Sequence, residues 1–126
     1  MRALTLTQPY AQLVILGRKR FETRGWTTGY RGLLAIHAAK GWTAEDRQYA
    51  RDQGLDPDAL PLGAVVGEVS LRAVYDSDHA LTFVGAAEER MGDYSSGRFA
   101  WELAVPRRYV EPIPAKGKLG LWYWQP

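Results

Sequence analysis

Several features that define common protein classes are missing from this chain. Its 126 residues include no cysteine, which excludes disulfide bonds and cysteine-ligated zinc and suits a reducing compartment. Histidine occurs twice, as His37 and His79, which is too few for a multi-histidine metal site. We therefore expect neither a bound metal nor a cofactor.

Long apolar segments and familiar catalytic motifs are absent as well. No run approaches the roughly 20 residues needed to cross a bilayer, and the first eight residues lack the apolar core of a signal peptide. We therefore expect a soluble, cytoplasmic protein with no membrane partner. Walker loops, dinucleotide fingerprints, nucleophile elbows and metalloprotease helices do not occur, so metalloenzyme chemistry is disfavoured.

The composition that remains is that of an ordinary globular protein. Hydrophobic residues make up 46% of the chain and charged residues 24%. The net charge is only +2, so any attraction to nucleic acid must come from a local basic patch. No repeat, low-complexity tract or long linker divides the chain. Residues 1–126 are therefore predicted to form a single domain.

The spacing of apolar residues predicts two small helices and several short strands. Pro9 and Gly17 delimit a helix over Tyr10–Leu16. Thr43 begins a second helix over Ala44–Gln53, with an imperfect capping box. Extended segments are expected at Leu4–Leu6, Lys19–Thr23, Leu33–Ala38, Gly63–Tyr75, Phe99–Val105 and Gly120–Trp124.

The second half of the chain favours a barrel. Gly63–Tyr75 suits a long, bent strand, with Gly67 available for a bulge. Apolar residues at every second position from Phe99 to Val105 predict one buried face. Residues 76–93 are poorly periodic and predict a crossing segment with some helix. These elements predict an α+β barrel and not a doubly wound sheet.

One segment gathers charge beside the first predicted helix. Lys19 and Arg24 can contact phosphate or polarise a carbonyl oxygen, and Glu22 can accept from an amino group or a ribose hydroxyl. This mixture suits a nucleoside or nucleotide. Glu22 and Arg24 share one face of an ideal strand, whereas Lys19 joins them only from the turn after Gly17. The alternative is a solvated surface pair that contributes little.

Aromatic, histidine and other basic positions supply further candidates. Trp26, Tyr30 and Trp42 can stack on a base, although core packing is favoured for Trp42 and equally plausible for Trp26. His37 has the strand parity of buried neighbours, which favours a structural role over ligand contact. Further candidates are Lys40, which adds positive charge, Glu102, and two basic stretches expected in turns, Pro106–Tyr109 and Lys116–Lys118. Solvent exposure is the default for Glu102 and the favoured interpretation of the two stretches.

The charged segment also resembles a known family. The run Gly17–Arg24 behind a Gln-Pro helix resembles the Gly-x-Lys-x-x-Glu-x-Arg pattern of the ASCH family. The similarity continues through Leu62–Gly67, Gly97–Leu103 and Lys118–Trp122, so it covers nearly the whole chain. The resemblance implies a PUA-like mixed β-barrel with short flanking helices, whose cleft binds RNA or a nucleotide-like ligand.

The resemblance also implies which residues form the cleft. It places Lys19, Glu22 and Arg24 in the lining, beside a first helix that begins with Gln8, Pro9 and Tyr10. A bacterial relative with an ASCH-like barrel removes the acetyl group of N4-acetylcytidine with a Lys, a Thr and a Glu. Here Glu22 occupies the position of that Thr, and Thr23 is adjacent.

Two classes of function therefore remain open. The first is a binding module for RNA or a nucleoside or nucleotide. The second is a small hydrolase acting on a modified nucleoside or on RNA, with Lys19 as base or oxyanion partner and Glu22 as proton shuttle. Thr23 is then a catalytic candidate, but the sequence leaves the nucleophile open among Thr23, Tyr10, Ser95 and Ser96. We expect the cluster's charges to be partly exposed, so that they matter more for ligand than for stability. The oligomeric state is not specified.

Overall fold

The computed structural model describes residues 1–126 and is organised around one six-stranded sheet. The strand order is β2-β5-β4-β3-β1-β6, with β1 and β3 parallel and every other pair antiparallel. The strands are β1 Arg2–Leu6, β2 Phe21–Arg24, β3 Gly32–Ala38, β4 Ala64–Asp76, β5 Phe99–Pro114 and β6 Leu121–Tyr123. The helices are α1 Tyr10–Ile15, α2 Ala44–Asp52, α3 Ser77–Ala80 and α4 Ala86–Glu89, with a 3-10 turn at Pro57–Ala59.

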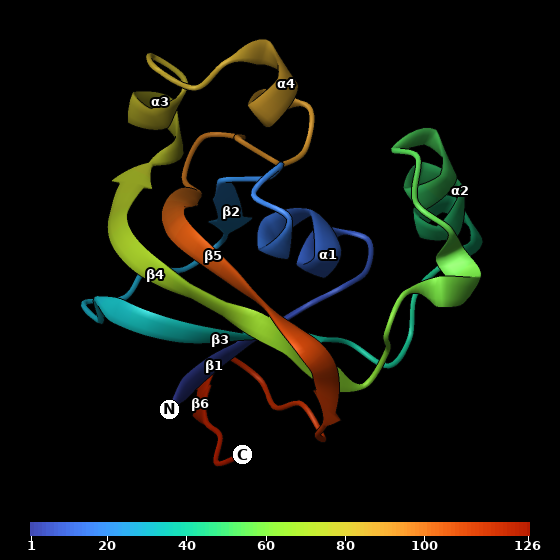
Figure 1. The fold of residues 1–126 in the computed structure, drawn as a ribbon. Helices are drawn as coiled ribbons and strands as arrows, with labels where there is room; N and C mark the ends of the chain where they lie inside the picture. The colour runs from blue at the N-terminus through green and yellow to red at the C-terminus, as the bar shows by residue number, and fades with distance from the viewer.

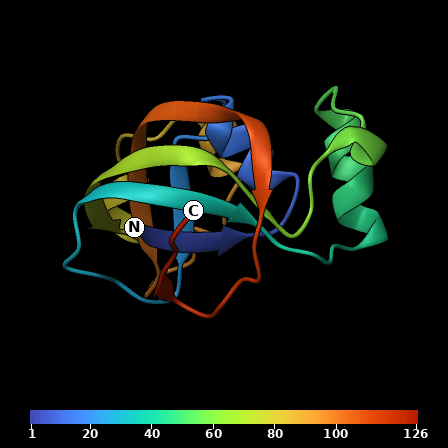
Figure 2. The same ribbon diagram turned by 60° about the horizontal axis from the view of Figure 1, so that its bottom comes forward.

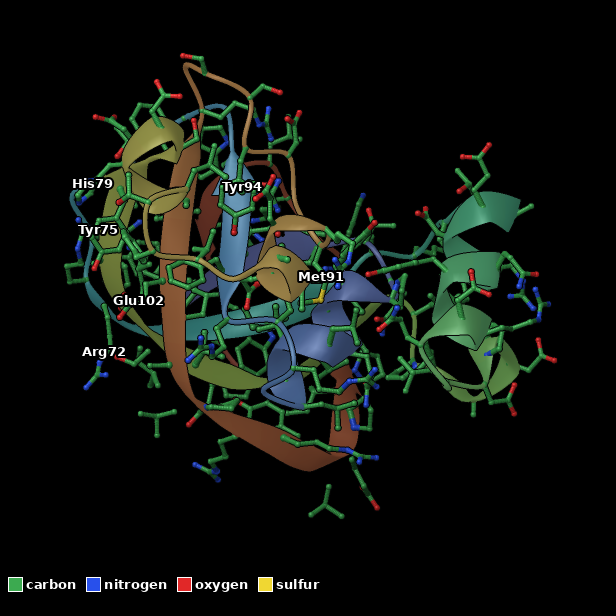
Figure 3. The ribbon with its side chains drawn as sticks, turned by 90° about the horizontal axis from the view of Figure 1, so that it is seen from above. Arg72, Tyr75, His79, Met91, Tyr94 and Glu102 are labelled. Atoms are coloured by element: carbon green, nitrogen blue, oxygen red, sulfur yellow. The ribbon has the colours of Figure 1, made fainter.

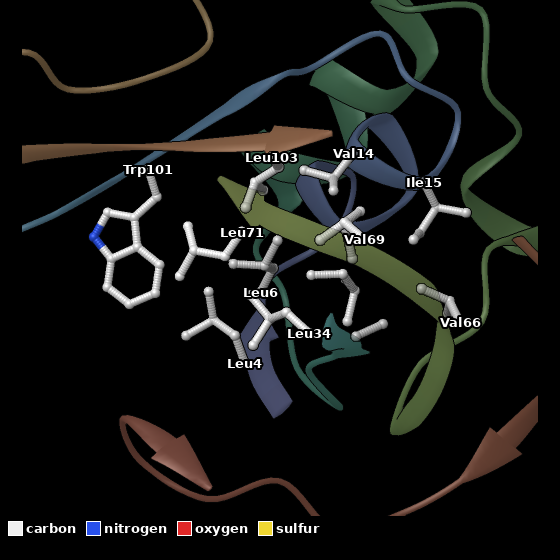
Figure 4. Packing of buried hydrophobic residues seen from close by; sticks show 13 residues of the cluster. Leu4, Leu6, Val14, Ile15, Leu34, Val66, Val69, Leu71, Trp101 and Leu103 are labelled. Atoms are coloured by element: carbon white, nitrogen blue, oxygen red, sulfur yellow. The ribbon is translucent and has the colours of Figure 1, made fainter. Parts of the chain in front are cut away.

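The sheet curls, and α1 lies inside the curl (Figures 1 and 2). The apolar side of α1 joins side chains from β1, β3, β4 and β5 in a core of 13 buried residues, centred on leucines, valines and Trp101 (Figure 4). Burial of this kind is needed because a helix of six residues is not stable alone in water. The architecture confirms the predicted α+β fold, in which the sheet curls into a half-barrel with β2 and β6 at its edges.

The entry into α1 is fixed by Gln8. Its side-chain oxygen accepts from the Gln12 N–H at 3.0 Å, and its side-chain nitrogen donates to the carbonyl of Pro61 at 3.0 Å. Gln8 thus satisfies one free donor of the first turn and ties the helix to the segment before β4. The predicted helix is confirmed and is shorter by one residue, because Leu16 is its C-cap.

Long, bent strands β4 and β5 form the curved part of the sheet. The β3–β4 register shifts between the partners of Val65 and Gly67, which confirms the predicted bulge. A Cβ on Gly67 would lie 2.4 Å from the Arg107 carbonyl oxygen, so the approach of β5 requires glycine. Val105 adopts a φ of 49° and is 73% exposed. The prediction of one buried face through Val105 was therefore wrong, because the irregularity turns the strand after Leu103.

The basic stretch after Val105 lies in a strand and not in a turn, which corrects the sequence interpretation. Arg107 pairs with Glu68 across β4 and β5 at 3.2 Å, and the Tyr109 hydroxyl donates to the same carboxylate at 2.8 Å. Burial and this hydrogen bond raise the pKa of Tyr109 to about 12. These arginine and tyrosine side chains therefore support the pairing of the two long strands.

The remaining helices lie outside the curl of the sheet (Figure 1). The predicted second helix is confirmed and is shorter by one residue, and Thr43 and Asp46 form both bonds of the capping box that was expected to be imperfect. Helix α2 stands to one side of the sheet (Figure 1). The segment after β4 contains α3 and α4, which confirms its expected helical content. Met1 and Trp124 are hydrogen-bonded, so the two ends of the chain lie together. None of the helices is long and apolar enough to cross a membrane.

Candidate functional site

Strand β2 and the turn before it bring three charged side chains into contact. Glu22 and Arg24 lie on one face of β2, with Arg24 Nε 3.2 Å from Glu22 Oε2. Lys19 precedes β2 in the turn after α1, where its backbone N–H donates to the carbonyl of Leu13 at 3.0 Å. Lys19 Nζ lies 3.1 Å from Glu22 Oε1. Lys19 therefore joins the cluster from the turn, the one geometry that the sequence allowed for it.

Burial increases from Arg24 through Glu22 to Lys19. Their side chains are 27%, 13% and 1% exposed, respectively. Lys19 Nζ also donates to the Phe21 carbonyl and lies 5.9 Å from the centroid of the Tyr10 ring. The expectation of partly exposed charges was therefore wrong for Lys19. A buried charge is stable only if an opposite charge compensates for its loss of solvation. The ion pair with Glu22 therefore stabilises the buried Lys19.

Arg24 closes the open side of the curled sheet. Its Nη2 donates to the backbone carbonyl of Thr5, at the end of β1, at 2.7 Å. Three strands separate β2 from β1 in the sheet order, so this bond does not join neighbouring strands. It crosses the gap between β2 and β1 where the curled sheet stays open, which is called here the seam. The buried Nε of Arg24, although close to Glu22, has no hydrogen-bond partner. Because this Nε is buried, a ligand reaches Arg24 only through the exposed part of its side chain.

A cavity of about 490 Å³ lies at this seam and is called here the Glu22 pocket. Its lining residues come from β1, α1, β2, the start of α2 and the segment after α4. They are Thr5, Thr7, Tyr10, Glu22, Thr23, Arg24, Asp46, Arg90, Met91, Gly92 and Asp93. The Thr23 hydroxyl accepts from the Asp93 N–H at 3.0 Å, which fixes the segment after α4 against β2. The volume falls within the usual range for small-ligand sites.

Two tyrosines border the charged cluster. Burial, followed by the charges of Tyr49, Asp46 and Glu22, raises the pKa of Tyr10. Tyr94 packs with Phe21 of β2 and is seen over that strand in Figure 3. Its hydroxyl is buried without a hydrogen-bond partner, and burial together with the charges of Glu88 and Glu22 raises its pKa strongly. Both phenols therefore remain protonated at neutral pH.

The pocket combines one carboxylate with cationic and hydroxyl groups. Glu22 retains acceptor capacity beyond its two cationic partners, because a carboxylate accepts at about four lone-pair positions. Arg24 and Arg90 supply donors, Thr23 a hydroxyl and Tyr10 an aromatic ring. Lys19 does not line this pocket and acts on it through Glu22. Such a set recognises a planar, polar ligand that carries both donors and acceptors.

Comparison with known proteins identifies the family. The model of the ASCH domain matches residues 4–114. This chain belongs to the ASCH domain family. A crystal structure of ASCH from Zymomonas mobilis superposes with a TM-score of 0.64 at 14% identity, covering 98% of this chain and 87% of that one. A point mutant of the same protein gives 0.63 at 16% identity, with 98% and 89% covered.

A curated relative is much longer than this ASCH domain. Activating signal cointegrator 1 of Mus musculus is 29% identical over 130 residues. The match covers 94% of this chain but 21% of the relative, so the ASCH domain spans about a fifth of that protein. The solved structures support the fold, and the family model supports the assignment.

Several predicted site residues of this ASCH domain lie outside the Glu22 pocket. Gln8 is fully buried and uses both ends of its amide within the fold, and Pro9 is buried beside it. Trp26 packs edge-on against Trp101, with ring centroids 4.9 Å apart. Glu102 accepts from the Tyr75 hydroxyl at 3.1 Å and lies on the other side of β5 from Met91 (Figure 3). These residues do not share one cleft with Glu22.

Three other predicted contacts gather in a second cavity. His37, Lys40 and Lys118 line a space of about 850 Å³ beyond the carboxyl ends of β1 and β3. Both ring nitrogens of His37 are engaged within the fold, with Thr5 Oγ1 at 3.1 Å and the Ala115 carbonyl at 2.7 Å. The structural interpretation of His37 is therefore supported by its contacts, while its ring still borders the cavity.

Sequence reasoning missed seven of the eleven residues that line the Glu22 pocket. Thr5 and Thr7 are small polar residues at the end of a strand, with no motif of their own. Arg90 to Asp93 fall within the poorly periodic segment. The charged residues there do not indicate which residues of the segment lie beside β2. A signal was present in the unusual run Arg90-Met91-Gly92-Asp93, but only the fold places it against Thr23.

Proposed function

We propose that this ASCH domain binds RNA or a nucleotide, with a nucleoside unit in the Glu22 pocket. The observation that carries the proposal is the chain of contacts from the buried Lys19 through Glu22 to Arg24, because Glu22 and Arg24 line a pocket at the sheet seam. A fold stabilised only by packing gains little from burying such charges. A site that recognises a polar base uses them directly.

Each group has a complementary partner on a nucleoside. Glu22 accepts from an exocyclic amine or a ribose hydroxyl, and the partly exposed guanidinium of Arg24 donates to a base carbonyl. Arg90 is exposed at the rim, where a guanidinium contacts phosphate. Tyr10 offers an aromatic face for stacking. The family relation to a protein named activating signal cointegrator 1 specifies no ligand, so the proposal depends on this geometry.

A binding titration tests the proposal. A labelled single-stranded RNA and cytidine monophosphate are titrated at low and high salt with the wild-type chain, Glu22→Gln and the matched control Glu102→Gln. Phosphate contacts require affinity that falls as salt rises. Glu22→Gln should lower affinity for both ligands at least tenfold, about the effect of losing one charged hydrogen bond, whereas Glu102→Gln should not. Absence of binding to the wild-type chain at low salt would refute the proposal.

A hydrolytic function is the second candidate, because Glu22 and Thr23 both line the pocket and Lys19 contacts Glu22. In amide hydrolysis of N4-acetylcytidine, water adds to the acetyl carbon, the C–N bond breaks, and a proton passes to the leaving amine. The products are cytidine and acetate. Glu22 would move that proton, and the Thr23 hydroxyl would donate to the developing oxyanion.

Mass spectrometry of incubated substrates separates the two candidates. N4-acetylcytidine and a panel of RNAs are incubated with the wild-type chain and with Thr23→Val. Replacement of the acetyl group by hydrogen lowers the mass of the nucleoside by about 42 units. This loss, or the appearance of RNA fragments, would establish catalysis if it requires Thr23. Substrates that bind in the titration but remain intact at high protein concentration would exclude it.

A further inference from the structure

The second cavity, called here the lysine pocket, collects nearly all the lysine in the chain. Four lysines occur, and Lys19 is buried beside Glu22. The other three, Lys40, Lys116 and Lys118, all line the lysine pocket. No Asp or Glu lines it, and none of the three lysines forms a salt bridge. The pocket is therefore a concentration of unpaired positive charge in a protein whose net charge is small.

The wall that carries Lys116 and Lys118 is held in a defined position. The Ala115 N–H donates to the Gly63 carbonyl at 3.1 Å, and the Ala115 carbonyl is bonded to His37 at 2.7 Å. A Cβ on Gly117 would lie 2.7 Å from His37 Cε1. The loop therefore rests directly on the histidine ring, and the two lysines flank this contact. Apolar groups, including Leu62 and Pro114, form much of the remaining lining.

The lysine pocket adjoins the Glu22 pocket at Thr5, which lines both. The Thr5 backbone carbonyl accepts from Arg24 on the Glu22 side at 2.7 Å. The Thr5 hydroxyl contacts His37 Nδ1 on the lysine side at 3.1 Å and accepts from Trp122 Nε1 at 3.2 Å. One residue at the carboxyl end of β1 thus separates the Glu22 pocket from the lysine pocket.

We infer that the lysine pocket holds the phosphates of the nucleic-acid strand whose nucleoside occupies the Glu22 pocket, so that both pockets form one site across Thr5. The inference rests on the proposed function. It narrows the ligand from a free nucleotide to a strand of several nucleotides, because the three lysines of the lysine pocket can contact several phosphates, whereas a mononucleotide carries one. Lysine suits this role, since an ammonium group is a mobile point charge that follows a flexible phosphate chain.

The test compares a strand with a mononucleotide on charge-matched variants. The ligands are a labelled single-stranded RNA of about eight nucleotides and cytidine monophosphate. The double variant Lys116→Gln/Lys118→Gln is compared with Arg31→Gln/Arg51→Gln, which removes the same net charge at exposed positions outside both pockets. Thermal melts of all variants confirm that each is folded.

We expect the lysine variant to bind the RNA about tenfold more weakly at low salt, with a salt slope reduced by about 1.4, because each phosphate contact on a single strand contributes about 0.7. Its affinity for cytidine monophosphate should equal that of the wild-type chain. The arginine control should retain the wild-type affinity for both ligands.

Other outcomes overturn the inference in distinguishable ways. If cytidine monophosphate binds in a Glu22-dependent manner but the lysine variant binds RNA like the wild type, the continuous site is refuted and the proposed function stands. Equal weakening of both ligands by the lysine variant would place the mononucleotide itself in the lysine pocket. If polyglutamate, added at the same concentration of negative charge as the RNA, displaces the RNA, the lysine pocket binds polyanions in general and is not specific for nucleic acid. No binding of either ligand to the wild-type chain would refute both proposals.

Discussion

The two pockets that meet at Thr5 place their charges in opposite environments. The Lys19–Glu22–Arg24 cluster beside the Glu22 pocket is largely buried and paired within itself, and the Lys19 side chain is 1% exposed. In the lysine pocket the charges are unpaired and lie at the surface of a loop. Burial links recognition to stability, because removing one partner leaves an uncompensated charge inside the fold. For the exposed lysines, ligand recognition and stability are independent, because a solvated lysine contributes little to folding.

The largest expected effect is on the buried pair. Glu22→Ala should lower the free energy of unfolding by about 3–5 kcal/mol, because Lys19 Nζ then loses its carboxylate partner. Denaturation in urea measures this change. The matched control is Glu102→Ala, which loses one hydrogen bond from Tyr75 and should cost about 1 kcal/mol. Equal losses in the two variants would mean that Lys19 does not depend on Glu22.

A second comparison uses one glycine from each pocket. A Cβ at Gly117 would lie 2.7 Å from His37 Cε1, whereas a Cβ at Gly92 would approach Thr23 and Tyr94 at 3.1 Å. Gly117→Ala should therefore destabilise the fold by about 1–3 kcal/mol and Gly92→Ala by less. Thermal unfolding measures both. In addition, Gly117→Ala should weaken RNA binding more than mononucleotide binding, and the reverse preference would contradict the arrangement of the two pockets.

The third prediction concerns pH and the buried hydroxyl beside the Glu22 pocket. Because the pKa of Tyr94 is raised in the folded state, its contribution to stability is present below pH 10 and is lost as pH rises above that value. At neutral pH, Tyr94→Phe should be neutral or stabilising by up to about 1 kcal/mol, since the hydroxyl has no partner. Above pH 10 the variant should exceed the wild type by a growing margin.

Chemical denaturation at a series of pH values measures this difference. Tyr109→Phe serves as the comparison, because the Tyr109 hydroxyl has a partner in Glu68 and its removal should destabilise the fold at neutral pH. A difference between wild type and Tyr94→Phe that stays constant from pH 7 to about pH 11 would show that Tyr94 ionises normally.

The smallest expected effect is on stability in the lysine pocket. Lys116→Gln/Lys118→Gln should change the free energy of unfolding by less than about 0.5 kcal/mol, since neither lysine has an ionic partner. Urea denaturation under the conditions used for Glu22→Ala provides the measurement. A loss of 2 kcal/mol or more, about the effect of a broken buried contact, would show that these lysines belong to the fold and not to a ligand site.

Prediction from sequence succeeded where the signal was local. The helix after Pro9, the capping box of Thr43 and the bulge beside Gly67 follow from residues within a few positions of one another. It failed at Val105, where a backbone φ of 49° ends the alternation of β5. Neither the alternation nor the residue type indicates that irregularity, because valine rarely adopts this conformation.

In the candidate site, too, local features were predictable from the sequence and features set by tertiary packing were not. The spacing of Glu22 and Arg24 fixes their common face, and the turn after Gly17 allows Lys19 to reach them. The degree of burial of Lys19 was not predictable, because it depends on how α1 packs within the curled sheet. The gathering of His37, Lys40 and Lys118 in a cavity apart from Glu22 was not predictable either, because it depends on how segments distant in sequence pack together.

The sequence by itself determined the short helices, most strand positions, the charged cluster on β2 and the family. Local backbone preferences and side-chain periodicity act over a few residues, so a linear pattern records them. Only the tertiary structure decided that Arg24 reaches Thr5 across the seam and that Lys40 meets Lys116 and Lys118. Such contacts depend on the pairing and curl of strands distant in sequence, because each pairing shifts the position of every residue beyond it.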